Sequence, residues 1–216
     1  MRVLAIDPSL RGTGYAILET GTPAATGARA NAGVIPRGEE LGDSHHSAAA
    51  VTVPAPPVHI GRVGGGGTRA VGTRACEYGT IKNKSDLLPS SCLVAIHDRL
   101  AELIYKYAPD CCAVEGIIFV QSYRTAITMG AARGAALLAA AARGLPIYEY
   151  APRLVKAAVV GRGGADKSQV AFMVRALLGL HETPAPDAAD ALAIGLTHIR
   201  AQENPARVAL GDLVRI

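Results

Sequence analysis

Residues 2–7 have the sequence Arg-Val-Leu-Ala-Ile-Asp, a short apolar run that ends in an acid. A run of this kind predicts a buried strand with Asp7 at its carboxyl end. Residues 111–115, Cys-Cys-Ala-Val-Glu, repeat the pattern and place Glu115 at the end of another apolar run. If these strands lie side by side and parallel, both carboxylates emerge at one edge of the sheet, which is where sites form in open α/β sheets.

The remaining elements follow from turn signals and hydrophobic spacing. Turn-forming residues at 8–14 lead into a strand at 15–19, so the first two strands can form a hairpin. Further strands are predicted at 76–81 and 147–150, and helices around 93–107, 123–143, 152–160, 165–179 and 187–202. This order predicts an α/β fold with a five-stranded mixed sheet, antiparallel at the hairpins and parallel where helices cross over.

Residues 21–74 differ in character from the rest of the chain. Gly, Ala, Pro, Ser and Thr dominate, and long hydrophobic periodicity is absent. A structureless stretch of this length is rare inside a compact domain, so we interpret it as a low-complexity, disordered insertion between the second and third strands. A second interpretation, that it lies outside the natural coding sequence, stays open. Residues 1–216 are otherwise expected to form a single domain.

Composition limits the classes of function. The chain has 216 residues and a net charge of +4. Residues 21–74 carry five Arg against three acids and so account for +2 of this charge, which leaves the rest of the chain nearly neutral. A nucleic-acid surface must therefore come from local clustering of basic residues. No apolar stretch approaches the length of a membrane span, and an acid at position 7 does not fit a secretory signal, so a cytoplasmic protein is expected. The four cysteines have neither zinc nor disulfide spacing and are expected to be reduced.

Two more acids, Asp187 and Asp190, lie three residues apart in an Ala-rich segment. On a helix this spacing places both on one face, and the small Ala residues allow close approach to a sheet. Together with Asp7 and Glu115 they would form a cluster of like charges that needs a cation, and hard oxygen ligands select Mg²⁺ or Mn²⁺. Two such ions could activate a water and stabilise an in-line displacement at phosphorus. Taken singly, each acid could instead be a solvated residue or a helix cap.

Basic residues are concentrated in a Gly-rich segment before a predicted helix. Lys156, Arg162 and Lys167 lie in or beside it, and basic side chains with free backbone amides favour a phosphate. The alternative is a solvated basic loop.

The segment that follows Glu115 carries apolar and aromatic side chains. Ile118 and Phe119 could wedge between bases, and Arg124 could hold a phosphate. The alternative is that some of these apolar residues continue the strand into the core.

Several motifs, taken in order, resemble the RuvC family of Holliday junction resolvases. They lie at residues 6–15, 113–115, 148–152, 155–156, 164–170 and 187–194. The resemblance covers 1–20 and about 75–202. It implies a ribonuclease-H-like fold, a homodimer, paired nicks across a four-way DNA junction, and partnership with the RuvA–RuvB branch-migration complex. It also implies that the four acids bind metal and that Lys156 and Lys167 position the scissile phosphate.

The sequence departs from the family pattern at three positions. Ser9 replaces the usual Gly, Ile118 stands where an aromatic residue is common, and Ser122 replaces the usual Asn. Phe119 can take over the role of base wedge from position 118. The resulting hypothesis is a structure-selective DNA endonuclease that resolves Holliday junctions in recombination and repair. The alternatives are a related nuclease acting on other branched DNA or RNA, and an inactive junction-binding protein.

Overall fold

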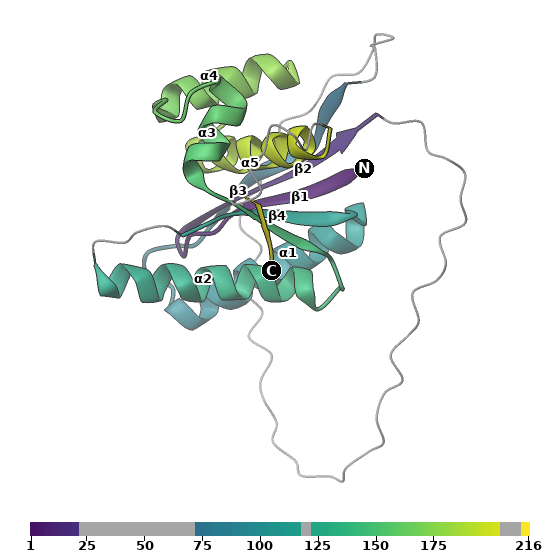
Figure 1. Ribbon diagram of the computed structural model, residues 1–216. Helices are drawn as coiled ribbons and strands as arrows, with labels where there is room; N and C mark the ends of the chain where they lie inside the picture. Colours follow the sequence, from purple (N-terminus) through teal and green to yellow (C-terminus); the bar gives the residue numbers. More distant parts are fainter. Residues whose placement is uncertain (22–71, 118–121, 204–212) are drawn as a thin grey trace, which may run out of the picture.

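The computed structural model describes residues 1–21, 72–117, 122–203 and 213–216. Its centre is a six-stranded sheet in the order β3-β2-β1-β4-β5-β6 (Figure 1). The strands are β1 (Arg2–Asp7), β2 (Gly12–Thr20), β3 (Thr73–Lys82), β4 (Cys111–Glu115), β5 (Ile147–Tyr150) and β6 (Leu213–Arg215). The β1–β4 and β4–β5 pairs are parallel, and the β1–β2, β2–β3 and β5–β6 pairs are antiparallel.

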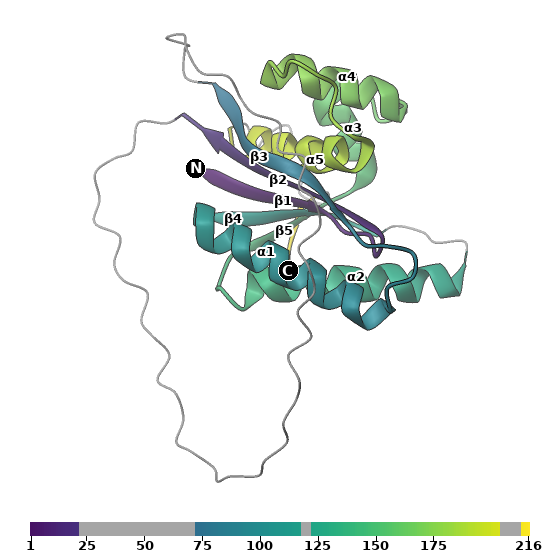
Figure 2. The ribbon, with the colours of Figure 1, turned by 180° about the vertical axis from the view of Figure 1, so that it is seen from behind.

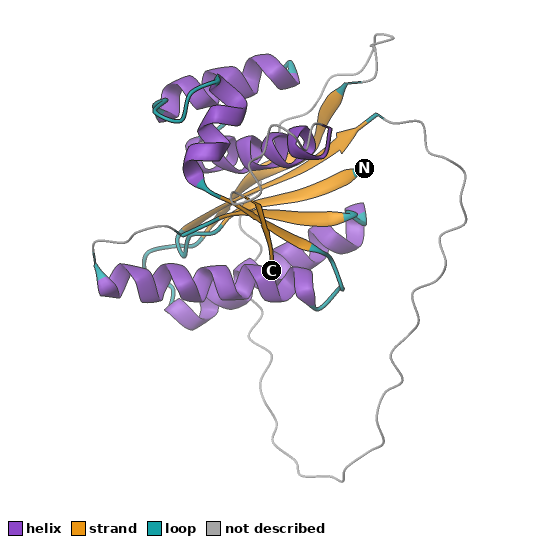
Figure 3. Ribbon diagram, in the orientation of Figure 1, coloured by secondary structure: helices purple, strands orange, loops and turns teal. Residues whose placement is uncertain are grey.

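Helices cover both faces of this sheet. The helices α1 (Pro89–Tyr107) and α2 (Tyr123–Ala141) lie on one face, and α3 (Pro152–Val160), α4 (Lys167–Leu178) and α5 (Pro186–Glu203) lie on the other (Figures 2 and 3). The alternation of side chains along β1 divides the core accordingly. Leu4 and Ile6 pack in the cluster with α1 and α2, while Val3 and Ala5 pack in the cluster with α3, α4 and α5.

Small residues let α5 lie unusually close to the sheet. A Cβ added to Gly195 would stand 3.1 Å from the Cβ of Ala5 and would overlap Leu18. A Cβ added to Gly14 would overlap the backbone carbonyl oxygen of Asp187 and lie 2.6 Å from its carbon. Glycine is therefore required at both positions by close approach, and this packing sets the position of the first turn of α5 over β1 and β2.

The five predicted strands and their mixed pairing are confirmed. The sheet also gains β6, which sequence reasoning missed because three residues carry too little pattern to predict a strand. One boundary was wrong: Thr73 and Arg74 belong to β3, where they pair with β2, and so they are not part of the insertion. The description of residues 1–216 as one domain stays a prediction, since residues 22–71 and 204–212 lie outside the described part.

The interpretation of residues 21–74 as disordered also falls almost wholly outside the described residues. Their points of attachment are nevertheless clear. Thr20 pairs with Thr73, and the Thr20 amide donates to the Met1 carbonyl at 2.9 Å. The segment therefore joins the sheet beside the start of β1, at the end opposite Asp7.

Two further expectations concern thiols and membranes. All four cysteines are free, and Cys92, Cys111 and Cys112 are buried. Within the described ranges, no helix combines the length and the apolar character needed to cross a bilayer.

Candidate active site

Asp7 and Glu115 lie at neighbouring strand ends. The strands β1 and β4 are parallel, and the register that pairs Ile6 with Val114 brings the next residue of each strand to the same edge of the sheet. Ala5 and Ala113, two residues earlier, pack in the core beneath α5. Because side chains alternate along a strand, Asp7 and Glu115 face the same side as these alanines.

The other two acids come from the start of α5. Asp187 lies in the first turn of that helix and Asp190 one turn later, both half-buried. The Asp187 carboxylate lies against Gly12 at the start of β2, where an added Cβ would stand 2.8 Å from Oδ2. The helix therefore presents its acids towards the edge at which β1 ends.

Burial and the charges of neighbouring acids raise the pKa of three of the four acids. Burial, followed by the charge of Asp190, raises the pKa of Asp7 from 3.8 to about 6. Burial, followed by the charges of Asp7 and Asp190, raises the pKa of Glu115 from 4.5 to about 7. The pKa of Asp187 is also raised, by burial and then by Asp190. The fold thus gathers four carboxylates whose negative charges oppose one another.

Lys167 provides positive charge inside this cluster. Its Nζ donates to Oδ2 of Asp190 at 2.7 Å, and this hydrogen bond raises the pKa of Lys167. The lysine is the first residue of α4, whose start is fixed by a reciprocal cap. The Gln169 amide donates to Asp166 Oδ1 at 2.8 Å, and the Asp166 amide donates to Gln169 Oε1 at 3.3 Å.

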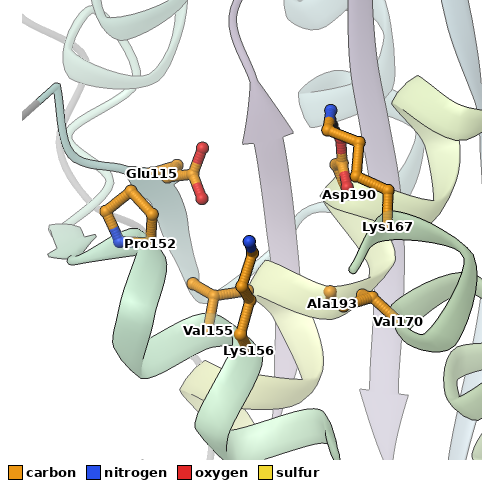
Figure 4. Close-up of a pocket in the computed structure, with 8 residues that line it drawn as sticks. All are labelled: Glu115, Pro152, Val155, Lys156, Lys167, Val170, Asp190 and Ala193. Carbon is orange, nitrogen blue, oxygen red and sulfur yellow. Dashed lines mark hydrogen bonds and ion pairs between the residues drawn. The ribbon is translucent and has the colours of Figure 1, made fainter. Parts of the chain in front are cut away.

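A cavity of about 210 Å³ opens between these elements (Figure 4). Glu115, Lys156, Lys167 and Asp190 supply its polar lining. Its walls are the smaller apolar side chains of α3, α4 and α5, namely Pro152, Val155, Val170 and Ala193. In Figure 4 the ammonium of Lys156 and the carboxylate of Glu115 point into the gap that faces Lys167 and Asp190. Such a mixture of carboxylates and ammonium groups suits a phosphate ester together with a cation.

The donor chemistry of the cluster fits a hard divalent cation. All four acids offer only oxygen, the ligand that Mg²⁺ and Mn²⁺ prefer, and their mutual repulsion favours binding of a cation. Among the described residues, however, no three Asp, Glu, His or Cys side chains are drawn together tightly enough to hold one ion. The acids are thus gathered around one edge, with Asp190 bonded to Lys167, without forming a compact ligand shell.

The residues predicted to contact DNA are placed less uniformly. Lys156 and Lys167 line the cavity, whereas Arg162 and Arg124 do not. Arg162 is exposed and donates to Gln169 at 3.0 Å, and Arg124 is exposed in the first turn of α2. Ile118 and Phe119 lie outside the described residues.

Sequence reasoning missed a second group of residues beside Glu115. Arg133, in the middle of α2, donates from Nη1 to the Glu115 carbonyl oxygen at 2.7 Å and from Nη2 to the carboxylate of Glu149 on β5. No local pattern identifies this contact, because the guanidinium reaches a backbone atom 18 residues away.

Comparisons with known proteins identify the family of this chain. Residues 65–198 match the family model described as crossover junction endodeoxyribonuclease RuvC. A protein of that name from Akkermansia muciniphila is 46% identical over 199 residues, covering 92% of this chain and 90% of the relative. Another from Saccharophagus degradans is 50% identical over 138 residues, covering 62% of this chain and 79% of the relative.

Solved structures give the same result. Thermus thermophilus RuvC is 27% identical with a TM-score of 0.67, and both chains are covered completely. The same protein in complex with a Holliday junction substrate is 25% identical with a TM-score of 0.68, again with complete coverage of both chains. By sequence and by fold, the chain belongs to the RuvC family of crossover junction endodeoxyribonucleases.

Proposed function

We propose that this protein is a structure-selective endonuclease that resolves four-way (Holliday) DNA junctions by metal-dependent hydrolysis of phosphodiesters, in recombination and repair. The observation that carries the proposal is a cavity lined by one strand-end acid, Glu115, one helix acid, Asp190, and two lysines, with Asp7 and Asp187 close enough for their charges to act on these acids. The related Thermus thermophilus RuvC has been solved with a Holliday junction substrate, which supports the choice of DNA.

In this proposal Asp7, Glu115, Asp187 and Asp190 hold divalent cations. Mg²⁺ is the expected ion, Mn²⁺ can substitute for it, and two ions per site are expected. When bound, such ions supply an activated water and neutralise charge on the attacking and leaving oxygens. The raised pKa values of Asp7 and Glu115 mean that protons compete with cations for these carboxylates near neutral pH.

Lys156 and Lys167 would bind the scissile phosphate. Their ammonium groups can donate to phosphate oxygens and offset the charge that develops on them during hydrolysis. Until substrate binds, the 2.7 Å bond to Lys167 holds the Asp190 carboxylate in place. Arg162 and Arg124 are proposed to contact the backbone of the duplex arms, and Ile118 or Phe119 to wedge between bases at the crossover.

The protein is further proposed to act as a homodimer through the exposed face of α2. Tyr123 is 82% exposed there, and Ile127 and Leu138 are each 60% exposed. Nothing would contact a Cβ added to Gly130 or Gly134, so this face also permits close approach of a second helix. A two-fold interface would present two active sites to a two-fold-symmetric junction and so produce paired nicks. The RuvA–RuvB branch-migration complex is the partner that family membership suggests.

A substrate comparison tests the proposed activity. Purified protein is offered a synthetic four-way junction, a linear duplex and an RNA–DNA hybrid, with Mg²⁺ or with chelator, and Asp7→Asn is assayed in parallel. The expected result is cleavage of the junction in Mg²⁺ only, with Asp7→Asn binding the junction but leaving it intact. Cleavage that survives chelation or Asp7→Asn contradicts the mechanism, and preference for the hybrid contradicts the substrate. Wild-type protein that binds but never cuts supports an inactive junction-binding protein.

A further inference from the structure

The side chain of Arg133 links three elements next to the active site. It is only 13% exposed although it belongs to α2, whose opposite face is open. One of its terminal nitrogens donates to the Glu115 carbonyl oxygen at 2.7 Å, and the other donates to the Glu149 carboxylate. A planar guanidinium has the geometry to satisfy two acceptors at once, which a lysine ammonium on a single stem does not reproduce.

The peptide unit between Glu115 and Gly116 is fixed on both sides. Its carbonyl oxygen accepts from Arg133, and its amide donates to the Tyr150 carbonyl oxygen at 2.9 Å. A Cβ added to Gly116 would lie 2.7 Å from Oε1 of Glu149, so glycine lets that carboxylate lie directly against the chain. The backbone is therefore held at the point where β4 ends and the segment towards residue 118 begins.

The side chains of this arrangement lie on the opposite face of the sheet from the acids. Glu149 is the register partner of Val114, which packs in the core beneath α1 and α2, whereas Glu115 faces α5. Arg133 consequently cannot act on substrate in the cavity. Within the part of the chain that the structure describes, Arg133 is connected to the site through the backbone of Glu115, whose orientation determines where the carboxylate of that residue points.

We propose that Arg133, held by Glu149, is a positioning residue that orients Glu115 for metal binding and catalysis. This inference rests on the proposed function of the four acids. An acid that ligates metal must be held within about 0.5 Å of its working position, so loosening the Glu115–Gly116 peptide weakens catalysis without removing any group from the cavity. The same bond joins α2, the proposed dimer helix, to the active-site strand.

Three variants separate a positioning role from a purely structural one. Arg133→Gln removes the guanidinium that donates to both the Glu115 carbonyl and Glu149. Arg133→Lys keeps the positive charge but offers a single donor nitrogen. Glu149→Gln keeps an oxygen acceptor for the guanidinium. Arg143→Gln is the matched control, an exposed arginine just after the far end of α2. For each protein we would measure the single-turnover rate of junction cleavage, its dependence on Mg²⁺ concentration, the junction Kd in chelator, and Tm.

Arg133→Gln is expected to lower the cleavage rate about 10- to 100-fold, the usual loss when a residue that orients a metal ligand is removed. It should also raise the Mg²⁺ concentration needed for half-maximal rate. Junction Kd should change less than about 3-fold, since phosphate contacts dominate affinity. Arg133→Lys and Glu149→Gln should each cleave the junction faster than Arg133→Gln but more slowly than wild type. Arg143→Gln should cleave it at the wild-type rate.

The outcomes that overturn the inference differ from those that overturn the activity. If wild type cleaves and folded Arg133→Gln cleaves at the same rate with the same Mg²⁺ dependence, Arg133 positions nothing. The inference also fails if two results are found together. The first is a cleavage rate in Arg133→Gln that falls only in proportion to the fraction of folded protein. The second is an Mg²⁺ dependence of Arg133→Lys equal to that of wild type. If wild type itself does not cleave the junction, the proposed function fails instead.

Discussion

Replacing Asp7 by Asn is expected to stabilise the metal-free protein. Asp7 is half-buried, and burial together with the charge of Asp190 raises its pKa from 3.8 to about 6. A carboxyl group whose pKa is raised by folding contributes stability that is complete below pH 3.8 and is lost as pH rises through about 6. One pKa unit corresponds to about 1.4 kcal/mol, so at pH 8 the ionised carboxylate destabilises the folded state by about 3 kcal/mol.

An amide of the same shape removes this penalty, and it also relieves Glu115, whose pKa Asp7 helps to raise. We therefore expect Asp7→Asn to raise the free energy of unfolding at pH 8 by about 2–3 kcal/mol in chelator, and Tm by roughly 5–10 °C for a chain of this size. The difference should shrink as pH falls from 8 to 4, because folded Asp7 becomes protonated as pH passes below about 6, and it should vanish only below pH 3.8, where Asp7 is protonated in both states. Added Mg²⁺ should stabilise wild type more than Asp7→Asn, since only wild type keeps all four acids.

The assay is urea or thermal unfolding of both proteins from pH 4 to pH 8, with chelator and then with Mg²⁺. Asp86→Asn, in an exposed turn before α1, serves as the control and should change stability by less than about 0.5 kcal/mol. If Asp7→Asn destabilises the protein at pH 8, or if its effect is the same at every pH, burial and the charge of Asp190 do not destabilise the ionised form of Asp7 in the folded protein.

Three other perturbations have defined outcomes. Gly14→Ala should destabilise the protein by about 1–3 kcal/mol and reduce junction cleavage, because the added methyl group overlaps the backbone of Asp187. Gly164→Ala is the control, since an added Cβ there meets open space. Equal stability of the two variants would contradict the packing of α5 against β2. Replacing residues 22–71 by a short Gly-Ser turn between β2 and β3 should leave junction cleavage intact, because the segment attaches at the sheet end away from the acids. Loss of cleavage with an unchanged circular dichroism spectrum would show that the segment contributes to cleavage. Ile127→Glu should convert the protein to a monomer in sedimentation measurements, because it places a charge on the exposed face of α2, and a stable dimer of this variant would place the interface elsewhere.

The parts of the site that could be predicted from sequence are those whose signal is local. An apolar run ending in an acid places Asp7 and Glu115 at strand ends, since both the strand and its boundary are visible within a few residues. The three-residue spacing of Asp187 and Asp190 in an Ala-rich helix places them on one face. Only the parallel pairing of β1 with β4 had to be supposed, and the register that pairs Ile6 with Val114 confirms it.

The features that could not be predicted depend on contacts between distant parts of the chain. The bond from Lys167 to Asp190 spans 23 residues and the bond from Arg133 to Glu115 spans 18, and neither leaves a trace in local spacing. The strand β6 has only three residues and forms by pairing antiparallel with the edge of β5. Gly116 reads as an ordinary turn residue until the carboxylate of Glu149 is seen against it.

Crystals soaked in Mn²⁺ test directly whether four acids from β1, β4 and α5 jointly hold a catalytic divalent cation. We expect an anomalous difference peak among Asp7, Glu115, Asp187 and Asp190 in wild-type crystals, and loss or marked weakening of that peak in Asp7→Asn crystals soaked in the same way. Wild-type crystals at saturating Mn²⁺ with no peak between these carboxylates, or with the peak elsewhere in the molecule, would contradict it.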